Sequence, residues 1–210
     1  MLEKYFKNSS EVFAKPFIKT LKYLNLKPNT VSIFGLAVII AGSYCFYLEN
    51  RNLGIVLIFL GSAIDGLDGP YAREMNLVTE RGGILDSLID RIGELIIWSV
   101  VGISFTDSDI ELFTVFTILV SSNLIPYMRA KSEYFGLQNK KGSAARPERV
   151  IFAVLYMFFD FNFLYVYIFA AITWITALQR FTYLYQHLSC LLYTSPSPRD
   201  ATLSRMPSSA

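Results

Sequence analysis

The sequence is poor in cysteine and histidine, the side chains that most often carry thiol chemistry or bind transition metals. It has two cysteines and one histidine among 210 residues. Cys45 stands alone in an apolar stretch, where a small buried hydrophobic side chain is the usual role. His187 comes at the end of the last apolar stretch, where we predict an interfacial side chain rather than a metal ligand. The composition therefore indicates no disulfide and no thiolate chemistry.

Charged residues are also scarce. They make up 17% of the chain and apolar residues 53%, whereas soluble proteins average about 25% and about 45–50%. A helix of about 20 residues crosses the roughly 30 Å of hydrocarbon in a bilayer. We therefore predict an all-α integral membrane protein with six transmembrane helices in one membrane domain, residues 27–189. The predicted spans are Thr30–Leu48, Leu53–Tyr71, Ile84–Phe105, Ile110–Ala130, Arg149–Phe159 with flanks, and Phe163–Leu184.

The two ends of the chain differ from this domain. Residues 1–26 lack the continuous apolar segment of a cleavable signal peptide. Apolar residues from Phe13 to Leu24 recur at helical spacing with lysines between them, which predicts an interfacial amphipathic helix. The alternative is an amphipathic helix packed on the protein itself. Residues 190–210 have no apolar periodicity, and we predict a disordered or artefactual tail without a function.

The basic residues indicate an orientation. Six spans place both termini on one side, and only Arg51 among the lysines and arginines falls in a loop on the other side. Because cytoplasmic loops are enriched in lysine and arginine, we predict a multi-pass protein of the cell membrane. Both termini, the active site and the basic loop over residues 127–150 would then face the cytoplasm.

Four aspartates lie at the ends of two apolar stretches. Asp65 and Asp68 end one predicted span, and Asp86 and Asp90 open the next. At these spacings each pair projects from one face of a helix, so two adjacent helices can direct four carboxylates into one volume. Unpaired carboxylates in a medium of low dielectric are costly. The pattern therefore predicts a site for hard cations, Mg²⁺ or Mn²⁺, with two ions.

Pro70 follows this first pair of aspartates closely. Proline inside a helix removes a hydrogen bond and clashes with the preceding turn. The sequence therefore predicts that the second span either bends near Pro70 or ends a turn earlier.

The aspartates belong to a longer pattern, D-x-x-D-G-x-x-A-R-x8-G-x3-D-x3-D, with eight fixed positions in 26 residues. The pattern resembles the signature of the CDP-alcohol phosphotransferases. These integral membrane enzymes transfer a phosphatidyl-type group from a CDP-lipid to an alcohol and release CMP. The resemblance extends from about Phe13 to Arg180. It implies a homodimer that acts on membrane lipids, and we expect no nucleic-acid partner.

The resemblance also implies a role for each position of the pattern. Asp90 would be the general base as well as a metal ligand. Arg73 would bind the phosphates of the nucleotide, and Gly69, Ala72 and Gly82 would leave space for it. The implied metal ligands are Asp65, Asp68, Asp86 and Asp90.

The basic loop bears on the acceptor alcohol. Residues 127–150 read YMRAKSEYFGLQNKKGSAARPERV. With Gln179 and Arg180, this segment resembles the branch that makes phosphatidylinositol phosphate, or its archaeal ether-lipid counterpart, from inositol 1-phosphate. Composition alone would also fit contact with anionic lipids. The candidates implied by the resemblance for binding the acceptor phosphate are Arg129, Lys131, Arg146, Arg149 and Arg180.

Three alternatives stay open at this point. Glycerol 3-phosphate could use the same cations, giving phosphatidylglycerol phosphate. A non-catalytic protein that binds lipid or cations would keep the carboxylates but would not need Gly69, Ala72 and Gly82. A transporter also places acids in the membrane, but no internal repeat is visible in this sequence, as many transporter folds would require.

Overall fold

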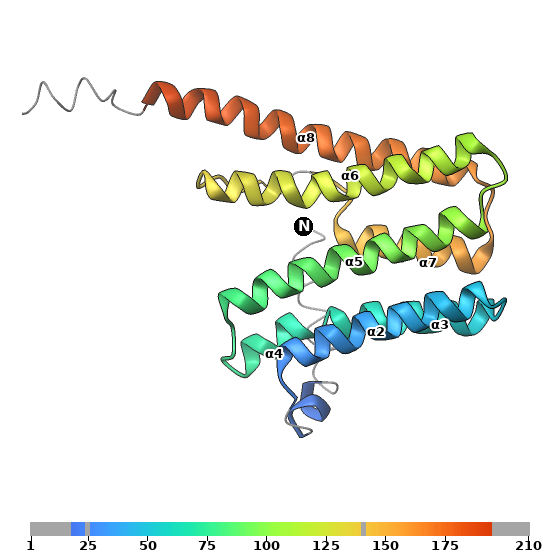
Figure 1. The fold of residues 1–210 in the computed structure, drawn as a ribbon. Helices are drawn as coiled ribbons and strands as arrows, with labels where there is room; N and C mark the ends of the chain where they lie inside the picture. Colours follow the sequence, from blue (N-terminus) through green and yellow to red (C-terminus); the bar gives the residue numbers. More distant parts are fainter. Residues whose placement is uncertain (1–17, 24–25, 140–141, 195–210) are drawn as a thin grey trace, which may run out of the picture.

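The computed structural model describes residues 18–23, 26–139 and 142–194, and the side chains up to residue 188. Residues 18–23 are helical. Seven further helices follow in these ranges, and the predicted all-α class is confirmed (Figure 1). They are α2 (Pro28–Tyr47), α3 (Arg51–Asp65), α4 (Asp68–Glu74), α5 (Glu80–Ser104), α6 (Asp109–Tyr134), α7 (Arg146–Phe159) and α8 (Leu164–Thr194).

The long helices lie side by side, and each runs in the direction opposite to the one before it (Figure 1). As a result, the C-terminal ends of α3, α6 and α8 lie at the same end of the bundle as the N-terminal ends of α2, α5 and α7. The short helix α4 also lies at this end (Figure 1). Most of the predicted site residues fall on or near these helix ends, so the topology gathers them into one region.

Four membrane spans satisfy both length and apolar composition in the described part of the chain: Pro28–Tyr47, Arg51–Glu74, Asp109–Tyr134 and Leu164–Leu188. The other two predicted spans correspond to α5 and α7. Helix α5 is 25 residues long but carries six charged residues in its first 15. Helix α7 has only 14 residues. The six-span arrangement is thus confirmed for four helices and stays a prediction for α5 and α7.

Large apolar side chains cover much of the outside of the bundle. More than half of the surface of Phe34, Phe59, Phe116 and Phe158 is exposed. In water such faces would favour aggregation, whereas lipid solvates them. Inside, Trp98 of α5 stacks on Phe169 of α8 with ring centroids 5.7 Å apart. The core between α5, α7 and α8 is therefore aromatic.

Helices α2 and α3 approach closely through glycines. A Cβ added to Gly35 would lie 2.9 Å from the Gly61 carbonyl oxygen and from the Asp65 amide nitrogen. A Cβ at Gly42 would lie 2.9 Å from the Gly54 carbonyl oxygen. Small residues allow membrane helices to pack backbone against backbone. This contact holds the last turn of α3, and with it Asp65, against α2.

The second predicted span is interrupted between Asp65 and Asp68. Helix α3 ends at Asp65, and α4 begins at Asp68 after Gly66 and Leu67. Pro70 then lies in the first turn of α4, where its missing N–H needs no partner within the helix. Helix α3 therefore ends before Pro70, although the apolar span Arg51–Glu74 continues through α4. The single helical face expected for Asp65 and Asp68 is wrong, because they lie on two helices.

The amphipathic N-terminal segment packs on α4. Ile18 is buried against Val31 and Tyr71, and the Tyr71 hydroxyl donates to the Leu26 carbonyl oxygen at 2.7 Å. Lys19 is exposed. Residues 18–23 are thus helical and contact the protein, and the interfacial position of this segment stays a prediction. The remainder of the predicted helix, residues 1–17, lies outside the described residues.

At the C-terminus, α8 continues to Thr194. The predicted tail began at Cys190, so its first five residues are helical instead. From Leu164 to Ser195 the sequence contains no glycine or proline that would end the helix sooner. The rest of the predicted tail, residues 195–210, lies outside the described residues.

Candidate active site

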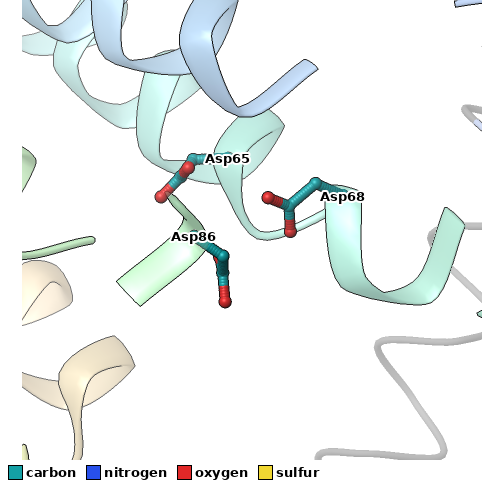
Figure 2. Close-up of side chains that lie close together, drawn as sticks. All are labelled: Asp65, Asp68 and Asp86. Carbon is teal, nitrogen blue, oxygen red and sulfur yellow. The ribbon is translucent and has the colours of Figure 1, made fainter. Parts of the chain in front are cut away.

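Three of the four predicted aspartates form a cluster. Asp65 ends α3, Asp68 begins α4, and Asp86 lies in the second turn of α5 (Figure 2). One carboxylate oxygen from each lies within 4.8 Å of the other two. Asp65 and Asp68 are buried, with 1% and 7% of their surfaces exposed. The break between α3 and α4 lets two residues three apart in sequence approach the same point from different helices.

The cluster fits a hard divalent cation. The Asp65 Oδ1 atom is buried and has no hydrogen-bond partner, whereas Oδ2 accepts from Arg146. An unpaired buried carboxylate oxygen is costly unless a proton or a cation satisfies it. Three carboxylates in this arrangement are the oxygen donors that Mg²⁺ and Mn²⁺ prefer.

A hydroxyl group fixes Asp68 from α2. The buried Ser32 side chain donates its Oγ hydrogen to Asp68 Oδ2. Ser32 lies one turn into α2, which the glycine contact holds against α3. Ser32 was not among the predicted residues, because a lone serine at the start of an apolar span has no distinguishing sequence pattern.

Asp90 lies one turn beyond Asp86 on α5 and pairs with an arginine. Arg146, the first residue of α7, contacts Asp90 Oδ1 through Nη1 at 2.5 Å and Asp65 Oδ2 through Nη2 at 2.5 Å. The guanidinium therefore bridges the aspartate cluster and Asp90. Asp90 remains partly exposed, with 30% of its side chain accessible. The sequence predicted both residues, but for separate tasks.

One cavity, of about 270 Å³, lies on the α4 side of the cluster. Asp68 and Asp86 both line it. It also includes the four positions predicted to face a nucleotide, Gly69, Ala72, Arg73 and Gly82. A Cβ on Gly82 would lie 3.0 Å from Thr79 Oγ1 and 3.2 Å from Asn29 Oδ1. We call this space the α4 cavity.

A second cavity, of about 400 Å³, opens on the other side of Asp86 among α5, α6, α7 and α8. We call it the arginine cavity. Its lining includes Asp90 and five arginines. These are Arg91, Arg129, Arg146, Arg149 and Arg180. Asp86 lines both cavities, so the two spaces meet at the aspartate cluster.

Arg149 is the most deeply buried of these arginines, with 2% of its surface exposed. Its Nε and Nη2 atoms donate to the two carboxylate oxygens of Glu94 at 2.5 and 2.7 Å, and Nη1 donates to the Ala144 carbonyl oxygen at 2.7 Å. Glu94 is also buried and lies one turn beyond Asp90 on α5. This two-point pair neutralises Arg149. Glu94 was missed because the motif ends at Asp90.

The other predicted acceptor residues are placed differently. Arg129 pairs with Glu133 at 2.9 Å on the exposed surface of α6. Arg180 donates to the Ile125 carbonyl oxygen at 3.0 Å and is buried. The Lys131 ammonium lies 5.1 Å from the ring centroid of Tyr134, and Lys131 does not line the arginine cavity. The structure thus brings four of the five predicted acceptor residues together.

The fold and site together define an all-helical membrane protein with buried carboxylates between two polar cavities at one end of its bundle. The sequence matches the CDP-alcohol phosphatidyltransferase family over residues 25–181. The chain belongs to this family of multi-pass membrane enzymes of phospholipid synthesis, which confirms the prediction from the motif.

Relatives with known names agree with this assignment. The archaetidylinositol phosphate synthase of Pyrococcus horikoshii is 34% identical over 164 residues, which cover 77% of this chain and 85% of the relative. A crystal structure of Mycobacterium tuberculosis phosphatidylinositol phosphate synthase with CDP-DAG bound is similar with a TM-score of 0.71 and 27% identity. That similarity covers 88% of this chain and 95% of the other. A structure of the same synthase in complex with manganese and citrate has a TM-score of 0.72 at 27% identity, covering 88% and 90% of the two chains.

Proposed function

We propose that this enzyme transfers a phosphatidyl-type group from CDP-diacylglycerol or CDP-archaeol to inositol 1-phosphate and releases CMP. The relatives named above include an archaetidylinositol phosphate synthase and a phosphatidylinositol phosphate synthase. The observation that carries the proposal is the pair of cavities that meet at Asp86, one lined by small residues and the other by five arginines. A diphosphate donor and a phosphorylated acceptor would reach the carboxylates from opposite sides.

The α4 cavity would hold the CDP end of the donor. The absence of side chains at Gly69 and Gly82 leaves space against the backbone, and Arg73 supplies a cation for the diphosphate. Asp65, Asp68 and Asp86 would bind two Mg²⁺ or Mn²⁺ ions, with Asp90 completing the set. Those ions would neutralise the diphosphate and the charge that develops on departing CMP.

Asp90 would remove the proton from the attacking hydroxyl group. It lines the arginine cavity, where the acceptor would bind, and it lies one turn from the metal-binding Asp86. Arg146 contacts Asp90 Oδ1 at 2.5 Å and so fixes the position of this carboxylate. The hydroxyl oxygen would then attack the lipid-side phosphorus, and the bond from that phosphorus to CMP would break.

The arginine cavity would bind the acceptor phosphate. Arg129, Arg146, Arg149 and Arg180 line it. A phosphorylated acceptor would bring an anion to these guanidinium groups, which a neutral alcohol would not. Lys131, the fifth predicted residue, would act from outside the cavity on approaching anions or on lipid headgroups.

A substrate panel tests the proposal. Purified protein would be given CDP-diacylglycerol or CDP-archaeol with inositol 1-phosphate, inositol, glycerol 3-phosphate or serine, and CMP release would be followed. We expect CMP release with inositol 1-phosphate to be about tenfold to a hundredfold more efficient than with inositol. The reason is that a charge-assisted hydrogen bond contributes about 1.5–3 kcal/mol. Preference for glycerol 3-phosphate would show the phosphatidylglycerol phosphate reaction instead. Equal use of inositol and inositol 1-phosphate would refute a phosphorylated acceptor.

The arrangement in the membrane forms part of the same proposal. Six spans and an active site open to the cytoplasm agree with the alternating helices and with the basic residues around the site. The homodimer rests on the family resemblance alone. Labelling single cysteines introduced at Arg51 and Arg129 from each side of sealed vesicles would test the orientation. The two positions should react from opposite sides.

A further inference from the structure

The five arginines of the arginine cavity differ in whether a carboxylate already neutralises them. Arg146 pairs with Asp65 and Asp90, and Arg149 pairs with Glu94. Arg129 pairs with Glu133, although both side chains are more than half exposed. A guanidinium already paired with a carboxylate attracts a phosphate less strongly, because the incoming anion also meets the carboxylate. Several arginines of this cavity therefore carry a charge that a neighbouring carboxylate already compensates.

Arg149 is the clearest case of a neutralised cation. Both oxygens of Glu94 and one backbone carbonyl take three of its five N–H groups, in a position with 2% exposure. Breaking a buried pair of this kind is costly. Through these bonds Arg149 fixes the start of α7. It thereby positions Arg146, which lies three residues earlier on the same helix.

Arg91 is the opposite case. It lines the same cavity, and its side chain makes no ion pair or hydrogen bond within the described residues. It follows Asp90 directly on α5, and Ser87, one turn earlier on that helix, lines the cavity as well. Its uncompensated charge and a neighbouring hydroxyl group thus face the space beside the proposed general base.

We propose that Arg91, which the sequence motif did not indicate, is a principal binding residue for the acceptor phosphate, and that Arg149 is a positioning residue held by Glu94. The proposal deepens the proposed function and rests on it. Arg91 can offer two parallel N–H groups to a phosphate, and Ser87 can donate a third hydrogen bond. The phosphate would then bind to the residue that follows Asp90 in the sequence. It would lie close to the hydroxyl group that must lose its proton.

Steady-state kinetics of Arg91→Gln test this role. The KM for inositol 1-phosphate should rise about tenfold to a hundredfold, because the lost bond is charge-assisted. The KM for the CDP-lipid and the thermal unfolding temperature in detergent should change little, since Arg91 is exposed and unpaired. Arg91→Lys should recover part of the loss. Arg81→Gln is the matched control, because Arg81 is an exposed arginine on the same helix that lines neither cavity.

Two comparisons separate Arg91 from Arg149 and from the choice of acceptor. Arg149→Gln should lower the unfolding temperature, whereas Arg91→Gln should not. If the panel identifies glycerol 3-phosphate as the acceptor, the proposed substrate is wrong, but a rise in the KM for that ester in Arg91→Gln would still support Arg91. An unchanged acceptor KM in Arg91→Gln, or an equal rise in the KM for the CDP-lipid, would overturn the proposal.

Discussion

The α4 cavity and the arginine cavity share Asp86 but are built in different ways. Most of the α4 cavity comes from one stretch of chain, residues 68–86, with Pro28, Asn29 and Ser32 added from α2. The arginine cavity takes its side chains from four helices, between Asp86 and Arg180. The first is made by small residues and one cation, and the second by charges that mostly compensate each other. The two halves of the site should therefore respond differently to substitution.

Substitutions in the aspartate cluster, where the two cavities meet, should have the largest effect. Asp68→Asn and Asp86→Asn each remove one negative ligand and keep the side-chain volume. Loss of metal-assisted stabilisation worth several kcal/mol corresponds to a fall in CMP release of about a thousandfold or more. Manganese binding, followed by electron paramagnetic resonance, should weaken in parallel, while circular dichroism stays unchanged. Undiminished CMP release from either folded variant would contradict the metal site.

On the arginine side, Glu94→Gln should damage stability most. It leaves Arg149 buried without a counter-charge, and breaking a buried pair costs about 3–5 kcal/mol. The thermal unfolding temperature in detergent measures this loss. Glu133→Gln is the matched control, because it breaks an exposed pair with Arg129, and such pairs contribute only about 0.2–1 kcal/mol. Equal effects of the two substitutions would show that Glu94 has no special structural role.

On the α4 side, Gly82→Ala should impair donor binding alone. Its Cβ would lie 3.0 Å from Thr79 Oγ1 and 3.2 Å from Asn29 Oδ1, so the wall of the cavity must move. Overpacking of this kind costs about 1–3 kcal/mol, which corresponds to a rise of about tenfold in the KM for the CDP-lipid. Gly83→Ala should have a much smaller effect, because its Cβ meets no heavy atom within 4 Å. A rise in the acceptor KM instead would contradict the division between the cavities.

The smallest effect should come from outside both cavities. Deleting residues 195–210 should change neither membrane insertion nor CMP release, because this segment has no apolar periodicity with which to pack. Membrane fractionation and the CMP assay would measure both. Loss of activity on truncation would show that the segment belongs to the functional protein.

Some features followed from the sequence because they depend on local spacing. Apolar length predicted helices that cross a membrane, and spacing predicted that the aspartates gather. The residues that line the α4 cavity were implied by the resemblance of the 26-residue motif to a known family. Such patterns are readable because helical periodicity fixes which nearby side chains share a face. The break at Gly66 and Leu67 was only partly foreseen, since Pro70 indicated an end to the helix but not its exact position.

Other features were decided only by the tertiary structure. Glu94 and Arg149 are 55 residues apart, and Asp65 and Arg146 are 81 apart, yet each pair is in direct contact. The sequence supplied the charges of the arginine cavity, but a charge selects its partner by distance and burial in space rather than by position along the chain. The packing of α5, α6, α7 and α8 therefore determined which arginines are neutralised and left Arg91 unpaired among the described residues.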